Sequence, residues 1–227
     1  MSNYKTVFFI LGVLQIILGL SMIVPIMAQF YYNQVDSGFI GSGLVSIIFG
    51  VLFFLSNLDH EKKLTLPQAF LLTALSWLSI AIFGSLPFVF SDLSLSFTNA
   101  FFESMSGITT TGSTILANLN ETPKAILLWR AMLQWLGGIG IIVMAITLMP
   151  IMNIGGMQLF VISNTHTPEK ILPKSKEISV RLIAIYSSLT FVCAFFYKIF
   201  GMSFFDSIVH SMTTIATGGF SNYNESI

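Results

Sequence analysis

Two short segments of this sequence, residues 109–113 (TTTGS) and 216–220 (ATGGF), carry the residue types best suited to chemistry. A dehydrated cation needs several oxygen ligands at once, and backbone carbonyls that point at a common axis supply them. Glycine adopts backbone conformations that other residues avoid, and a Thr hydroxyl adds a further oxygen. We therefore interpret both segments as strands of a cation-selectivity filter of the potassium type. The predicted filter residues are Thr109, Thr110, Thr111, Gly112, Ser113, Ala216, Thr217, Gly218, Gly219 and Phe220, with K⁺ held at Thr110, Thr111, Thr217 and Gly218.

An internal repeat strengthens this interpretation. Residues 97–112 and 204–219 align without gaps at an offset of 107 positions (204 − 97). A fixed spacing of this kind indicates one structural unit used twice. A single Thr- and Gly-containing segment would be explained equally well as an ordinary turn. The offset pairs identical residues at Phe97/Phe204, Ser104/Ser211, Met105/Met212, Ile108/Ile215 and Gly112/Gly219.

The surrounding sequence predicts membrane-spanning helices that position these segments. Five apolar stretches reach the roughly 20 residues needed to cross a bilayer. Two shorter runs, residues 97–106 and 204–213, predict half-length helices whose negative C-terminal dipoles point at the cation. Non-helical backbone at membrane depth is tolerated where it lines a watery path. The predicted fold is therefore all-α and integral to the membrane, with spans at residues 7–28, 37–57, 66–90, 126–149 and 180–200.

Composition supports a membrane protein and excludes several other classes. Hydrophobic residues make up 54% of the chain and charged residues only 9%, against roughly 25% charged in soluble domains. The net charge of zero offers no basic surface for nucleic acid. The three His residues show no ligand spacing and Cys193 is alone, so we predict no side-chain metal site, no cofactor and no catalytic residue.

The distribution of Lys and Arg predicts the orientation. Alternating spans place seven basic residues on one side, which the positive-inside rule makes cytoplasmic. The N-terminus is then cytoplasmic and both filter segments open to the exterior. The seven residues are Lys5, Lys62, Lys63, Lys170, Lys174, Lys176 and Arg181.

Three charged residues near the filter segments are candidates for its support. Glu103 either attracts cations at the mouth or holds the filter by hydrogen bonds. Asp206 falls in the first turn of its short helix, where a negative charge suits the dipole, so we favour a structural role. Arg130 lies within an apolar span and needs a partner, for which Glu103 or Glu121 is suitable, unless it snorkels to the surface.

Three stretches together carry a resemblance to a known family. They are residues 103–114 (ESMSGITTTGST), 210–221 (HSMTTIATGGFS) and 127–140 (LLWRAMLQWLGGIG). They resemble the first two filter segments and the first inner helix of the TrkH/KtrB potassium-uptake superfamily, and the two additional N-terminal spans favour the TrkH branch. The resemblance implies helix–pore loop–helix units of the potassium-channel type in a bacterial inner membrane. It also implies a homodimer and a cytoplasmic nucleotide-binding regulatory subunit.

The family pattern gives a domain division. We expect an N-terminal two-helix domain at residues 1–65, a complete helix–pore loop–helix unit at 66–155, a cytoplasmic linker at 156–179 and a second unit at 180–227 that stops after its filter strand. The family uses four such units, so we expect this chain to be an N-terminal fragment of a potassium-uptake pore. Two alternatives stay open, namely a non-conducting fragment that assembles with other subunits and a symporter that couples K⁺ to Na⁺ or H⁺.

Overall fold

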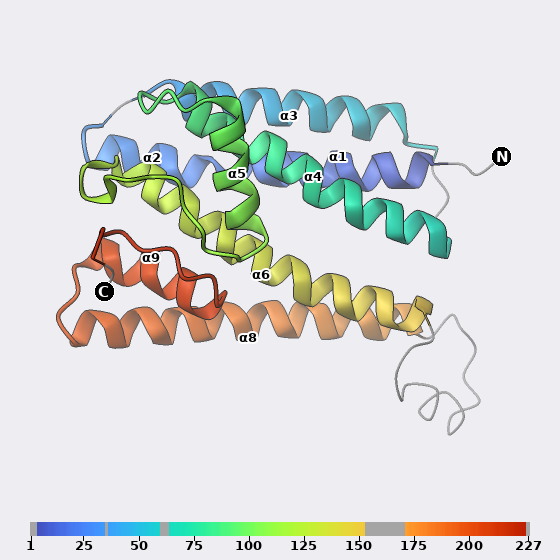
Figure 1. Cartoon of the computed structure of the whole chain (residues 1–227). Helices are drawn as coiled ribbons and strands as arrows, with labels where there is room; N and C mark the ends of the chain where they lie inside the picture. Colours follow the sequence, from blue (N-terminus) through green and yellow to red (C-terminus); the bar gives the residue numbers. More distant parts are fainter. Residues whose placement is uncertain (1–3, 35, 60–63, 153–170, 226–227) are drawn as a thin grey trace.

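The computed structural model describes residues 4–34, 36–59, 64–152 and 171–225, and these residues contain helices and no strands. The long helices lie side by side in a bundle, and two short helices lie against it (Figure 1). The elements are α1 (Lys5–Ser21), α2 (Ile23–Tyr31), α3 (Gly38–Ser56), α4 (Leu66–Phe90), α5 (Phe97–Ile108), the 3₁₀ turn Leu119–Glu121, α6 (Lys124–Met152), α8 (Ile171–Ile199) and α9 (Phe204–Ile215).

Five segments of the described chain are long and apolar enough to span a bilayer, which confirms the predicted membrane fold. Each of these segments overlaps one predicted span, and the third begins and ends at the same residues as its predicted span. The first segment combines α1 and α2, which are interrupted at Met22. Pro25 lies just after this interruption and has no N–H to donate to the carbonyl of Ser21, which accounts for the break. The spans are Lys5–Tyr31, Gly38–Ser56, Leu66–Phe90, Lys124–Met144 and Glu177–Ile199.

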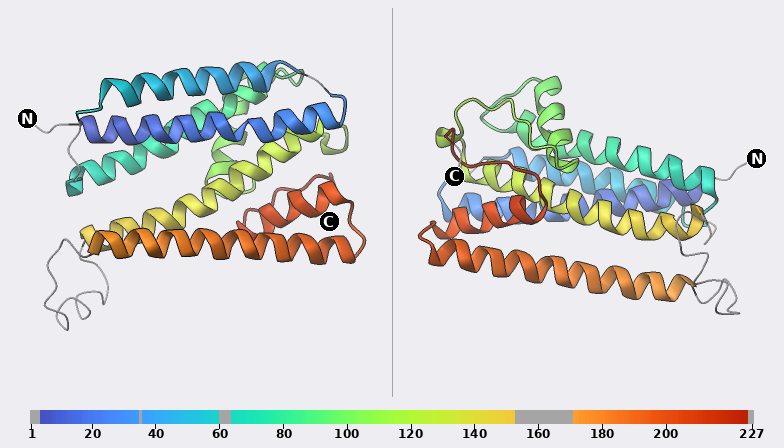
Figure 2. Two further views of the ribbon diagram at one scale, coloured as in Figure 1. Left: turned by 180° about the vertical axis from the view of Figure 1, so that it is seen from behind. Right: turned by 60° about the horizontal axis from the view of Figure 1, so that its bottom comes forward.

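The two N-terminal helices α1 and α3 pack closely through glycine. A Cβ atom at Gly12 would lie 2.6 Å from the backbone nitrogen of Phe54. One at Gly19 would lie 2.6 Å from Cγ1 of Ile47. Small residues let the backbones of membrane helices approach, and dispersion contacts then hold the pair together. Figure 2 shows α1 and α3 side by side from behind.

The short helices α5 and α9 begin in the same way. Each has 12 residues, two more than the sequence predicted. The hydroxyl of Ser96 caps α5 by accepting from the backbone N–H of Asn99, and that of Ser203 caps α9 by accepting from the N–H of Asp206. The two serines are 107 positions apart, so the repeat extends to the caps (203 − 96). Because the two helices also have the same length, their loops begin at matching positions.

Helix α6 lies at the centre of the apolar core. Trp129 and Leu133 on α6 are fully buried, and the Trp129 indole donates a hydrogen bond to the carbonyl of Gly84 on α4 at 2.9 Å. Phe39 of α3 packs edge-on against Trp129. This one helix therefore contacts α2, α3 and α4.

Some sequence-based predictions concern residues outside the described part of the chain. They include Lys62, Lys63 and Lys170 among the orientation residues, and the boundary at residues 155 and 156. Helices α1 and α8 begin at the same end of the bundle (Figure 1). Lys5 is the first residue of α1, so it lies at this end. The division into domains stays a prediction.

Candidate functional site

Two loops leave the C-terminal ends of the short helices, and their backbones have matching conformations. We name residues 109–118 loop 1 and residues 216–225 loop 2. Thr110 and Thr217 have φ of 57° and 55°, and Gly112 and Gly219 have φ of 79° and 80°. Each pair is separated by the 107 positions of the sequence repeat. The repeat therefore holds at the level of individual backbone dihedrals.

The hydrogen bonds that close the two helices match as well. In each copy three successive loop N–H groups fold back onto carbonyls of the preceding helix. They satisfy acceptors that a helix C-terminus otherwise leaves open. The pairs are Thr109→Met105 (3.0 Å) with Ala216→Met212 (3.1 Å), Thr110→Gly107 (2.9 Å) with Thr217→Thr214 (2.9 Å), and Thr111→Ser106 (2.9 Å) with Gly218→Thr213 (2.9 Å).

Positive φ at a Thr is unusual, because a β-branched side chain clashes in the left-handed region. Thr110 and Thr217 are held there by the surrounding hydrogen bonds, and backbone strain of this kind clusters at functional sites. In loop 1 two left-handed residues flank Thr111, whose φ is not positive. An extended strand directs successive carbonyls to opposite sides. The positive φ at Thr110, Gly112, Thr217 and Gly219 takes both loops out of this extended form at matching positions.

The two loops touch each other at glycine. A Cβ atom at Gly112 would overlap the carbonyl oxygen of Gly218, so a larger residue has no room at position 112. Gly219 faces open space among the described residues, and Thr111 and Thr217 are exposed. The structure therefore brings the two predicted segments together, although they are far apart in the sequence.

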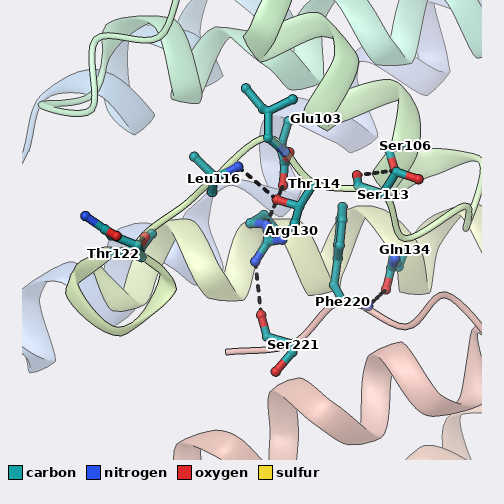
Figure 3. Close-up of polar contacts among 12 residues, drawn as sticks. Glu103, Ser106, Ser113, Thr114, Leu116, Thr122, Arg130, Gln134, Phe220 and Ser221 are labelled. Carbon is teal, nitrogen blue, oxygen red and sulfur yellow. Dashed lines mark hydrogen bonds and ion pairs between the residues drawn. The ribbon is translucent and has the colours of Figure 1, made fainter. Parts of the chain in front are cut away.

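A buried ion pair lies behind the loops (Figure 3). The Arg130 Nε lies 2.6 Å from Oε1 of Glu103, and both side chains are buried. Glu103 also accepts hydrogen bonds from the hydroxyl of Thr114 at 2.8 Å and the N–H of Ile115 at 3.0 Å. In this structure Glu103, and not Glu121, is the partner of Arg130, and neither side chain of the pair reaches the surface.

Arg130 also reaches loop 2. Its Nη1 donates to the carbonyl of Ser221 at 3.1 Å, and its guanidinium lies 4.1 Å from the centre of the Phe220 ring. The second contact is a cation–π interaction, which gains strength where water is excluded. One side chain thereby joins the carboxylate that holds loop 1 to the backbone of loop 2.

Asp206 holds loop 2 from the start of α9. Its carboxylate accepts from the Ser203 hydroxyl at 2.6 Å, the Asn222 amide at 2.7 Å and the Tyr223 hydroxyl at 2.8 Å. Burial raises the pKa of Asp206, but these three hydrogen bonds and the charge of Lys124 outweigh it and hold the pKa below its usual value. The geometry supports the structural role favoured from sequence.

The two units place their anchoring carboxylates at different positions. The 107-residue offset pairs Glu103 with His210 and Asp206 with Asn99. His210 is buried and its Nδ1 lies 3.0 Å from the carbonyl of Asp206. Each loop is therefore bonded to one carboxylate of the preceding helix. In the aligned helices the two carboxylates lie four positions apart.

Two residues of the site escaped the sequence analysis. The hydroxyl of Ser106 donates to the carbonyl of Ser113 at 2.6 Å. The side-chain oxygen of Gln134 accepts from the N–H of Phe220 at 3.3 Å. Gln134 is four residues after Arg130 on α6, and this spacing puts both on one helix face, which was the available signal.

Comparison with known proteins agrees with this geometry. The family model for TrkH, described as a cation transport protein, matches residues 35–227, which is most of the chain. The chain belongs to the TrkH family. The family predicted from the sequence is thereby confirmed.

Individual TrkH relatives match nearly the whole chain. It is 39% identical over 218 residues to the Trk system potassium uptake protein TrkI of Halomonas elongata, covering 96% of this chain and 44% of that protein. The Trk system potassium uptake protein TrkH of Vibrio parahaemolyticus is also 39% identical, over 229 residues, covering 99% of this chain and 47% of the relative.

A solved structure is also similar over nearly the whole chain. The crystal structure of the potassium transporter TrkH from Vibrio parahaemolyticus superposes with a TM-score of 0.87 at 36% sequence identity, covering 98% of this chain and 45% of that one. The chain spans about half the length of the curated relatives it matches.

Proposed function

We propose that this chain forms part of the pore of a Trk-type potassium uptake system. K⁺ crosses the plasma membrane through a filter to which loops 1 and 2 contribute backbone carbonyls. The transport needs no covalent chemistry, and we assign no enzymatic activity or cofactor. K⁺ is the transported ion.

The matching backbone of the two loops carries this proposal. Positive φ recurs at Thr110 and Thr217 and again at Gly112 and Gly219. A turn that only connects helices has no need to repeat such strain at the same register. Cation ligation needs it, because the carbonyls of several strands must face one axis. The names of the relatives supply the ion, since the TrkI and TrkH proteins are potassium uptake proteins.

We assign the filter to the segments predicted from the sequence, residues 109–113 and 216–220. K⁺ lies at Thr110, Thr111, Thr217 and Gly218. Glu103, Arg130 and Asp206 support the filter from behind, since each is buried and each is bonded to loop atoms. None of the three needs to contact the ion.

Uptake by cells that lack their own potassium transporters tests the proposal. The product of the native gene should restore growth at low external K⁺ and should take up Rb⁺ in preference to Na⁺. Replacing Gly112 by Val should abolish uptake while the protein still reaches the membrane. Equal rescue by the wild type and this variant would refute the filter assignment.

A non-conducting role, in which the chain only assembles with other subunits, is the first alternative. It predicts no rescue by the native gene product in cells without those subunits. Symport of K⁺ with Na⁺ or H⁺ is the second. Coupling favours an ionisable group inside a span. Among the described residues the buried charged side chain within a span is Arg130, which is already paired with Glu103.

We further infer a bacterial inner-membrane location with the N-terminus cytoplasmic, supported by the five spans and the position of Lys5. A homodimer and a cytoplasmic nucleotide-binding subunit rest on the family resemblance. Labelling of single cysteines introduced at each end of the bundle tests the orientation. Cross-linking in native membranes followed by mass determination tests the dimer and the partner.

A further inference from the structure

One face of α6 follows the backbone of loop 2. Arg130, Gln134 and Gly138 are spaced by four residues and lie on this face. Arg130 bonds to the carbonyl of Ser221, while a Cβ atom at Gly138 would lie 3.4 Å from the Cα of Ala216. Gln134 lies between these two contacts.

Gln134 fills the space directly behind Gly218. A Cβ atom at Gly218 would overlap the amide group of Gln134, with the Nε2 at 2.6 Å. The Gln134 side chain is fully buried, and its oxygen accepts from the N–H of Phe220. Figure 3 shows Gln134 and Phe220 joined at this hydrogen bond, with Phe220 extending toward Arg130.

The opposite side of Gly218 faces loop 1. Its carbonyl oxygen occupies the place where a Cβ atom at Gly112 would lie. The peptide of Gly218 is therefore held between Gln134 behind and Gly112 in front. The volume of the Gln134 side chain sets how far loop 2 advances toward loop 1.

A purely structural role does not account for a Gln here. Its Nε2 is buried without a partner among the described residues, and a buried amide left unpaired is destabilising. An apolar residue of similar volume would fill the space without that cost. What the amide adds is a bond to the N–H of Phe220, which fixes the register of loop 2 along α6.

We infer that Gln134 is a positioning residue for ion selectivity. It sets the separation and the register of the two filter loops without touching the ion. The inference rests on the proposed function, because it assigns the same loops to the filter. It adds an element that comes from the inner helix of the first unit and acts on the filter strand of the second.

Gln134→Met is the first test, because Met keeps the volume and removes the hydrogen bond. We expect the variant to reach the membrane at the wild-type level. The ratio of Rb⁺ to Na⁺ uptake in transporter-deficient cells should fall about tenfold, since ligand geometry must be held to about 0.5 Å. An unchanged ratio would overturn the inference.

A size exchange tests the contact itself. Gly218→Ala should lower the uptake ratio, because the new methyl group meets Gln134. Left-handed backbone strain does not contribute, since φ at position 218 is not positive. Gln134→Ala makes room for this methyl group, so the double variant should reach the membrane in larger amounts than Gly218→Ala. Its uptake ratio should stay low, because the hydrogen bond to Phe220 is lost. A double variant no more abundant than Gly218→Ala would overturn the role of the Gln134 volume. Gly140→Ala is the matched control on α6, since a Cβ atom at Gly140 meets no atom of the described residues within 4 Å.

These outcomes separate the inference from the proposed function. A wild-type protein without K⁺-selective uptake refutes the proposed function. A selective wild type whose selectivity is indifferent to Gln134→Met refutes the positioning role alone.

Discussion

The Nε of Arg130 on α6 lies 2.6 Å from the Oε1 of Glu103 on α5, and neither side chain is exposed to solvent. Trp129 and Leu133, which are on α6 near Arg130 in the sequence, belong to the apolar core. Each member also bonds to a different loop, Glu103 to loop 1 at Ile115 and Arg130 to loop 2 at Ser221. The ion pair therefore joins α5, α6 and the two candidate filter loops.

Removal of Arg130 should be costly for this reason. Arg130→Ala leaves the Glu103 carboxylate buried and unpaired, and such losses amount to about 3–5 kcal/mol. We expect a clear drop in the thermal unfolding midpoint of the purified protein in detergent. The double variant Glu103→Gln/Arg130→Met removes both charges together and should lose less than Arg130→Ala alone. Equal losses in the two proteins would show that the pair is not electrostatically coupled.

The spans were predictable because length and hydropathy determine them, and the third span matched at both ends. The pairing of Glu103 with Arg130 was predictable in part, since a charge in an apolar helix needs a nearby opposite charge. For Gln134 the sequence shows only that it shares a helix face with Arg130, because its partners Gly218 and Phe220 lie more than 80 positions away. Local sequence patterns carry no record of such contacts.

The backbone conformation of the loops was also predictable only in part. Gly112 and Gly219 were expected to adopt backbone conformations that other residues avoid, and both have positive φ. Thr110 and Thr217 share that region, which local preference disfavours for a β-branched residue. Hydrogen bonds to α5 and α9 override the preference, so tertiary context decides these two positions.

The two loop glycines should tolerate alanine to different degrees. Both have positive φ, so either substitution brings about 1–2 kcal/mol of left-handed strain. Gly112 additionally contacts the carbonyl oxygen of Gly218, whereas a Cβ atom at Gly219 meets nothing within 4 Å among the described residues. We expect Gly112→Ala to reduce Rb⁺ uptake much more than Gly219→Ala, with equal membrane abundance. The reverse order would argue against the contact between the loops.

Asp206 should make the stability of loop 2 depend on pH. Its pKa in the folded state is held below the ordinary value of 3.8, so the unfolded state binds the proton more readily. The carboxylate therefore contributes stability above pH 3.8, and this contribution is lost as pH falls through the folded-state pKa. We expect Asp206→Asn to lower the unfolding midpoint at neutral pH, with the difference from the wild type shrinking below pH 3.8.

The control for Asp206 is a carboxylate without such an anchoring role. Asp92 is exposed. Asp92→Asn should change stability by no more than about 0.5 kcal/mol at neutral pH. A difference between the wild type and Asp206→Asn that stays constant with pH would show that the three hydrogen bonds do not depend on the charge.

Thr217 tests whether the backbone strain in loop 2 lowers the stability of the protein and is needed for ion selectivity. Its φ of 55° is strained for a β-branched residue, at about 1–2 kcal/mol. Glycine relieves this strain, while its greater freedom in the unfolded chain costs about 0.5–1 kcal/mol. We expect Thr217→Gly to unfold at the same temperature as the wild type or slightly higher. It should nevertheless lose its preference for Rb⁺ over Na⁺, because the hydroxyl is gone and the backbone of loop 2 is more flexible.

Thr214→Gly on α9 is the control. It removes a 2.8 Å hydrogen bond to Tyr197 from a helical residue and should lower the midpoint. A Thr217→Gly protein that is both less stable and fully selective would contradict the assignment of strain to ion binding.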